Sequence, residues 1–123
     1  MRRNRERGTA NPKRRKAPWQ PSKQRLQGLV EQALLDAYDE SEQRTGFFTM
    51  IEEHLALPFE TKVLGVAVTV EQIDLTEAGE IVANCRRRHE RCQSIPILDL
   101  SLPKPPPAGA EWIEAYRYWG RGR

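Results

Sequence analysis

Two short stretches of this chain concentrate carboxylate side chains. Residues 36–42 read DAYDESE and contain four acids, and residues 47–55 read FFTMIEEHL, in which two adjacent glutamates precede a histidine. Carboxylate oxygens are the ligands that calcium and magnesium prefer, whereas zinc and copper favour thiolate or imidazole ligands. The sequence lacks the D-x-D-x-D-G loop of an EF-hand. The two stretches therefore predict either a solvated acidic surface or a cation site of another kind.

The first acidic stretch falls at the expected C-terminal end of a helix. Asp36, Asp39 and Glu40 have the spacing i, i+3 and i+4, which predicts that they share one face of a helix over about residues 22–42. Carboxylates repel one another at this spacing, and the negative end of the helix macrodipole costs roughly 0.3–1 kcal/mol more for each. A bound cation would relieve both costs and explain this location, but acidic helix ends are also found at plain surfaces, so both interpretations stay open.

A second, shorter helix is expected over about residues 45–55, or only over residues 49–55. Thr49 and Glu52 match a capping box at its start, which gives Glu52 a structural role and leaves Glu53 available as a ligand. The link at residues 44–46 is too short to separate Glu53 far from the first acidic stretch. We therefore expect an oxygen-rich cation site at the junction of the two helices, with calcium as the preferred ion.

A second acidic patch is expected on the strands that follow. It would involve Glu60 on the first predicted strand and Asp74 beside a turn at residues 76–79, although acidic turns are also common at plain surfaces. The candidate metal ligands from both regions are Asp36, Asp39, Glu40, Glu42, Glu53, Glu60 and Asp74.

Signatures of catalysis are missing from the sequence. It contains no H-E-x-x-H motif, no Gly-rich phosphate loop and no G-x-S-x-G elbow. Cys85, His89 and Cys92 form the pattern C-x3-H-x2-C, but the arginines around them oppose a divalent metal, so we expect Cys85 to pack inward and the turn to be solvated. We therefore predict a non-enzymatic protein without catalytic or organic-cofactor sites. Its two cysteines form no disulfide framework, which is typical of a reduced, cytoplasmic protein.

Hydrophobic periodicity predicts the elements that must position these acids. Apolar residues recur at helical spacing in residues 26–37. From residue 59 the period changes to two, which predicts about four antiparallel strands with a β-bulge near residues 71–72. The last strand is expected over residues 92–100, where Pro96 indicates a sheet edge or a bend. An aromatic helix over residues 110–119 would close the fold by docking on the sheet. The predicted class is α+β: two N-terminal helices, a small twisted antiparallel sheet for which an SH3-like half-barrel is a reasonable arrangement, and a short C-terminal helix.

Charge divides the 123-residue chain into two parts. Residues 1–28 hold ten basic residues and one acidic residue, whereas the rest holds ten basic and sixteen acidic residues. We interpret residues 1–21 as a disordered basic tail and residues 22–123 as a single domain. Such a tail could make weak contacts with nucleic acid or an anionic surface by displacing counterions. No secretory signal and no membrane-spanning apolar run is recognised, so a cytoplasmic location is expected.

Several ordered motifs resemble one known family. They are TGFFTMIEE, LPFETKVLGVAVTVE, IPILDL and GAEWIEAY, and the resemblance covers about residues 34–119. The chain is similar to the small bacterial calcium-binding proteins of the type named from cyanobacteria, which are not EF-hand proteins. That resemblance implies Ca²⁺ bound through surface carboxylates, in a buffer or a sensor. The basic tail departs from the acidic character of the family.

The alternative hypothesis is a protein of a different class. A small SH3-like interaction module could bind nucleic acid or a protein partner through the basic tail and the sheet. Deletion of residues 1–21 separates the two hypotheses, because calcium binding should persist without the tail and nucleic-acid binding should not.

Overall fold

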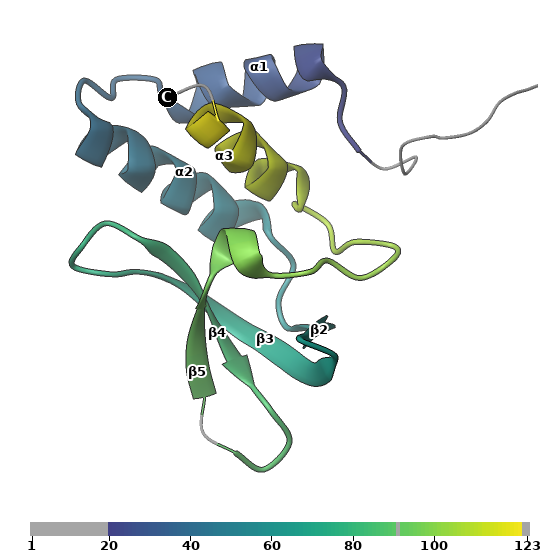
Figure 1. Ribbon diagram of the computed structural model, residues 1–123. Helices are drawn as coiled ribbons and strands as arrows, with labels where there is room; N and C mark the ends of the chain where they lie inside the picture. The colour runs from purple at the N-terminus through teal and green to yellow at the C-terminus, as the bar shows by residue number, and fades with distance from the viewer. Residues whose placement is uncertain (1–19, 91, 122–123) are drawn as a thin grey trace, which may run out of the picture.

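The computed structural model describes residues 20–90 and 92–121. In these residues three helices lie above one end of a four-stranded antiparallel sheet (Figure 1). The elements in chain order are α1 (Lys23–Ala33), α2 (Glu40–His54), β2 (Phe59–Val63), β3 (Val66–Leu75), β4 (Ile81–Arg86), β5 (Cys92–Pro96), the 3-10 helix η1 (Ile97–Asp99) and α3 (Glu111–Arg121). The predicted α+β class is confirmed. The predicted tail at residues 1–21 lies almost entirely outside the described residues.

Helix α1 is shorter than the sequence predicted. It begins after Ser22, whose hydroxyl accepts a hydrogen bond from the Arg25 N–H at 3.1 Å, and its C-cap is Leu34. The chain then turns through Asp36, which has φ of +64°, a left-handed conformation that aspartate tolerates better than most residues. The prediction of one helix reaching Glu42 is therefore wrong.

Helix α2 begins where the sequence placed the end of the first helix. Asp39 is its N-cap, and the side chains of Asp39 and Glu42 form a capping box with the backbone. The physical reason for the early break is this box, because each orphan N–H that a carboxylate satisfies at a helix start is stabilising. The predicted capping box at Thr49 is wrong: Thr49 lies inside α2 and its hydroxyl donates to the Thr45 carbonyl at 3.0 Å.

The sheet is a meander with strand order β2-β3-β4-β5. A tight turn at Leu64–Gly65 joins β2 to β3, and the pairing of β3 with β4 shifts register between Val70 and Gln72, which confirms the predicted bulge. Pro96 lies on the edge strand β5, also as predicted. The strand expected to run on to Leu100 ends at Pro96 and continues as η1.

The hydrophobic core lies between the helices and the covered part of the sheet. Phe47 of α2 is fully buried and its ring contacts those of Tyr116 and Trp119 of α3, at centroid distances of 5.4 and 5.2 Å. The aromatic helix predicted near the C-terminus is confirmed as α3. It packs mainly against α1 and α2, however, and not on the sheet as expected. Helix α3 thus contacts both α1 and α2.

Candidate metal centre

Four of the predicted ligands lie together at the connection between α1 and α2, which we define as residues 34–42. Asp36 lies in its turn, Asp39 caps α2, and Glu40 and Glu42 belong to the first turn of α2. All four are exposed to solvent. The Asp36 carboxylate makes no hydrogen bond or ion pair with any described residue, so it is the acid of this group that is available for a ligand.

Asp39 and Glu42 are partly engaged by the backbone. The Glu42 N–H donates to Asp39 Oδ1 at 2.8 Å, and the N–H groups of Tyr38 and Asp39 donate to Glu42 Oε1 at 2.7 and 3.3 Å. These bonds use one oxygen of each carboxylate. The other oxygen of each has no hydrogen bond within the described part of the chain, so both side chains keep one oxygen for a cation.

Glu40 already forms an ion pair with an arginine of the same helix. Its Oε2 lies 2.5 Å from Arg44 Nη2, one helical turn further along α2. Arg44 also lies over Gly79 in the turn between β3 and β4. Burial raises the pKa of the nearby Tyr116 hydroxyl; the charge of Arg44 opposes that rise, and the carboxylates of Glu80 and Glu40 add to it. Arg44 thus pairs with Glu40 of its own helix and lies against the turn between β3 and β4.

The electrostatic argument made from the sequence reverses in the structure. Because Asp39, Glu40 and Glu42 lie at the N-terminal end of α2, the macrodipole stabilises them, by typically 0.3–1 kcal/mol each. The predicted helical cost that a cation would relieve is therefore absent. A cation at this place must be held by its ligands alone, against the positive end of the helix.

A polar hollow opens at the same connection. It measures about 300 Å³, and oxygen-bearing side chains of the connection and of α2 line it: Asp36, Ser41, Glu42, Thr45 and Thr49. Its floor is the crossing of Ala33 and Gly46, where the helices touch closely. The hydroxyl groups were not among the predicted ligands. Their helical spacing in the sequence, 41, 45 and 49, is the signal that would have found them.

The other predicted ligands lie elsewhere. Glu53 is on the same continuous helix as Glu42, eleven residues later, which at 1.5 Å per residue places them about 16 Å apart along the axis. The expected link at residues 44–46 is helix, so the prediction that Glu53 faces the first acidic stretch is wrong. Glu60 lies on β2, and Asp74 on β3 accepts a hydrogen bond from Asn84 Nδ2 at 2.8 Å. Their role as ligands stays a prediction.

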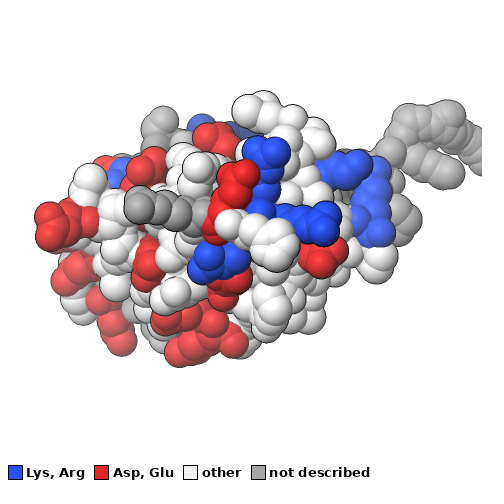
Figure 2. Space-filling model, turned by 90° about the horizontal axis from the view of Figure 1, so that it is seen from below, with Lys and Arg blue, Asp and Glu red and all other residues white. Residues whose placement is uncertain are grey.

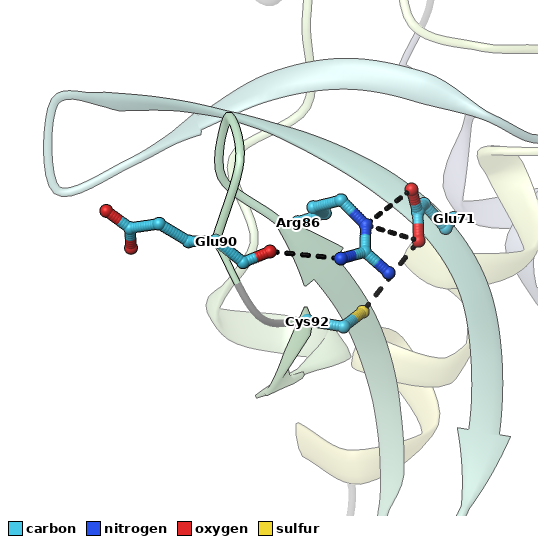
Figure 3. A network of polar contacts seen from close by, with 4 residues as sticks. All are labelled: Glu71, Arg86, Glu90 and Cys92. Carbon is cyan, nitrogen blue, oxygen red and sulfur yellow. Dashed lines mark hydrogen bonds and ion pairs between the residues drawn. The ribbon is translucent and has the colours of Figure 1, made fainter.

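A separate polar network lies on the sheet (Figure 3). Arg86 Nε donates to both oxygens of Glu71 at 3.2 and 3.1 Å, and its Nη1 donates to the Glu90 carbonyl at 3.0 Å. The Glu71 carboxylate raises the pKa of Arg86. Cys92 is exposed beside this network, whereas Cys85 is buried, and burial raises the pKa of the Cys85 thiol. The expectation that Cys85 packs inward is confirmed.

Charge on the molecule is unevenly distributed. On the face shown in Figure 2, most acidic side chains lie on the left half, and basic side chains concentrate towards the right half. Among residues 20–90 and 92–121, no group of three or more acids, histidines or cysteines is already arranged to hold a metal ion. Within the same ranges, no helix combines the length and the apolar character needed to cross a membrane.

Comparison with known proteins gives one match. Residues 27–120 match the model of a family described as calcium binding, of the CcbP type. No curated protein and no solved structure matches the chain. The match spans all three helices but for the first residues of α1 and the last of α3, and the whole sheet. It supports Ca²⁺ as the bound ion and a non-enzymatic protein, and it lends no support to a nucleic-acid contact. The resemblance seen in the sequence is confirmed: the chain belongs to the CcbP-type family of calcium-binding proteins.

Proposed function

We propose that this protein binds Ca²⁺ in the hollow at the α1–α2 connection and acts as a calcium buffer or sensor. The observation that carries the proposal is the donor set of the hollow. Two carboxylates and three hydroxyl groups line it, and neither sulfur nor imidazole does. Hard oxygen donors of this kind suit Ca²⁺ and do not suit zinc or copper. The residues present therefore fit the ion that the family implies.

Three side chains are the proposed principal ligands: Asp36, Asp39 and Glu42. Asp36 is unengaged, and the other two each keep one oxygen that the capping box does not use. Asp39 caps α2 and is not part of the lining of the hollow. Ser41, Thr45 and backbone carbonyls of the connection would supply neutral oxygens. The bound ion would supply the positive charge that draws these groups together, since they are not arranged as a finished site.

The position of these ligands at the N-terminus of α2 limits the affinity for Ca²⁺. Part of the carboxylate charge already serves the N-terminus of α2, and the macrodipole of α2 opposes a cation there. Affinity rises with ligand charge and with the rigidity of the site. We therefore expect a dissociation constant weaker than about 10⁻⁶ M, in the range of sensors and low-affinity sites. Mg²⁺ should bind less well, because it demands a tight octahedral shell and gives up water reluctantly.

The choice between buffer and sensor depends on what changes on binding. Leu35 and Tyr38 flank Asp36 and are 75% and 84% exposed. If Ca²⁺ reorders the connection, these two apolar side chains change their surroundings, as a sensor requires. A buffer would bind the ion with the connection unchanged. Amide and side-chain NMR shifts at residues 35–38 with and without Ca²⁺ distinguish the two.

The test is isothermal titration of the full chain with Ca²⁺ and, separately, with Mg²⁺. Asp36→Asn is the informative variant, because asparagine also tolerates the left-handed backbone and Asp36 has no described partner to lose. We expect it to weaken Ca²⁺ binding at least several-fold while leaving the unfolding temperature in EDTA unchanged.

The matched control is Asp99→Asn, which removes the same charge from an exposed residue of η1. It should bind Ca²⁺ as the wild type does. If Asp36→Asn and Asp99→Asn bind equally well, the α1–α2 connection is not the site, and the sheet acids Glu60 and Asp74 become the next ligands to replace.

A further inference from the structure

The buried face of the sheet continues beyond the helices that cover it. Val70 and Cys85 are paired across β3 and β4 and are buried in the core. Because side chains alternate along a strand, Val68 and Val66 point to the same side as Val70. In Figure 1 the helices lie above one end of the sheet, and the β2–β3 turn and the β4–β5 connection project beyond them. An apolar part of the core-facing side is thus left without a helix.

A hollow of about 260 Å³ lies on this uncovered part. Its floor is apolar and its rim carries two opposite charges; the lining residues are Val63, Leu64, Val66, Val68, Cys85, Arg87, Glu90, Gln93 and Ile95. The rim charges are close to one another, with Arg87 Nε 3.7 Å from Glu90 Oε2.

Leu64 belongs to the rim of this hollow and does not fill it. The leucine is 99% exposed and lies in the β2–β3 turn with φ of +51°. Glycine, asparagine and aspartate are the residues that such a turn position favours, and a leucine there bears backbone strain. Its side chain gains nothing from the fold of a single chain. An outlier of this kind points to a contact outside the chain.

We propose that the hollow is an interface with a second copy of this protein, in which Leu64 of each copy inserts into the hollow of the other. A two-fold contact requires one patch to be complementary to itself. This patch is self-complementary, because it presents both a projecting leucine and a cavity larger than a leucine side chain. The rim is also self-complementary, since Arg87 of one copy can pair with Glu90 of the other.

The interface is small, and this limits its strength. Stable interfaces use about 20–30 residues on each side, considerably more than line this hollow. The dimer should therefore be weak, with association visible at micromolar to millimolar protein concentrations. The contact is remote from the α1–α2 connection, so its existence does not depend on the proposed calcium site.

Sedimentation velocity of the full chain over that concentration range is the first measurement. We expect the weight-average mass to rise from monomer towards dimer, and Leu64→Lys to stay monomeric throughout. Leu35→Lys is the matched control, because Leu35 is also an exposed leucine and lies on the far α1–α2 connection. It should associate as the wild type does. A wild type that stays monomeric, or a Leu64→Lys variant that associates normally, overturns the proposal.

A charge-exchange experiment tests the two-fold arrangement itself. The Arg87→Glu variant has two acids on its rim, and the Glu90→Arg variant has two bases. Two copies of the same variant should therefore repel each other, and each variant alone should stay monomeric. An equimolar mixture should associate again, because every cross-pair is then of opposite charge. A misfolded variant would not be rescued by mixing. If the mixture remains monomeric while the wild type dimerises through Leu64, the proposed pairing across the rim is wrong.

Discussion

The two aspartates of the α1–α2 connection have different structural roles. Asp36 and Asp39 are three positions apart in the sequence, yet one carboxylate has no described partner and the other caps a helix. Spacing alone placed them on one helical face. Their roles can be separated by substitution, because the cap should affect folding and the unengaged carboxylate should affect the ion.

Removal of the Asp39 cap should destabilise the protein without metal. We expect Asp39→Ala to lower the free energy of unfolding by about 1 kcal/mol, because the Glu42 N–H loses its acceptor. Asp39→Ser removes the same charge but keeps a capping oxygen, so it should lose much less. Urea unfolding in EDTA measures both. Equal losses for alanine and serine would contradict the capping role.

Arg44 should weaken calcium binding in the wild type. Its guanidinium pairs with Glu40 and reduces the negative charge of the connection. We expect Arg44→Gln to raise the affinity for Ca²⁺ by about two- to five-fold, which corresponds to the ~0.5–1 kcal/mol of a partly exposed ion pair. Titration calorimetry at low ionic strength measures the change.

Arg88→Gln is the control for this substitution. It makes the same change of net charge on the exposed β4–β5 connection, beyond the end of the sheet that the helices cover. Its effect on Ca²⁺ affinity should be smaller than that of Arg44→Gln. Similar gains in the two variants would show that net charge, and not the Arg44–Glu40 pair, sets the affinity.

Among the elements, the crossing of α1 and α2 is the contact that shapes the hollow. A Cβ at Gly46 would overlap the Ala33 carbonyl oxygen, so the two helices approach closely only because residue 46 is glycine. Gly28, on the exposed side of α1, has open space around it. The two glycines therefore offer the same substitution with opposite consequences.

We expect Gly46→Ala to lower the free energy of unfolding by about 1–3 kcal/mol, as overpacking against backbone does. Gly28→Ala should raise it by roughly 0.5–1 kcal/mol, because alanine is the better residue inside a helix. Chemical unfolding of both variants tests the pair. A neutral Gly46→Ala would mean that the helices separate easily and that the hollow is not rigidly defined.

At the level of the whole molecule, charge is divided between the N-terminal residues and the rest. Residues 1–19 contain eight basic residues and one acidic residue, and residues 20–123 contain twelve basic and sixteen acidic residues. Opposite charges on one chain attract one another over about a Debye length, ~10 Å at 0.1 M salt. We therefore expect the basic residues to compete with Ca²⁺ for the acids of the connection.

Deletion of residues 1–19 should raise the affinity for Ca²⁺ at low ionic strength. The gain should disappear in high salt, because screening removes the competition in the full chain as well. Titration of the full and shortened chains at two salt concentrations measures it. A gain that persists in high salt would contradict a purely electrostatic competition.

Much of the fold follows from patterns that are local in the sequence. The helical spacing of apolar residues, the two-residue alternation of the strands and the parity slip at the bulge each depend on neighbours a few positions away. Such patterns predicted a first helix, about four antiparallel strands with their bulge, and the aromatic α3. The family could be recognised from the sequence for the same reason, since its motifs are short and contiguous.

The end of α1 and the form of the site depended on contacts that are distant along the chain. Asp39-x-x-Glu42 carries a capping signal, but its sequence also fits the last turn of a longer helix. The break is favoured because α2 can then fold back so that Gly46 meets Ala33 and Phe47 packs under α3. Only that packing places the acids at a helix N-terminus. It also determines which part of the sheet the helices leave uncovered, because the apolar pattern of a strand is the same whether or not a helix lies on it.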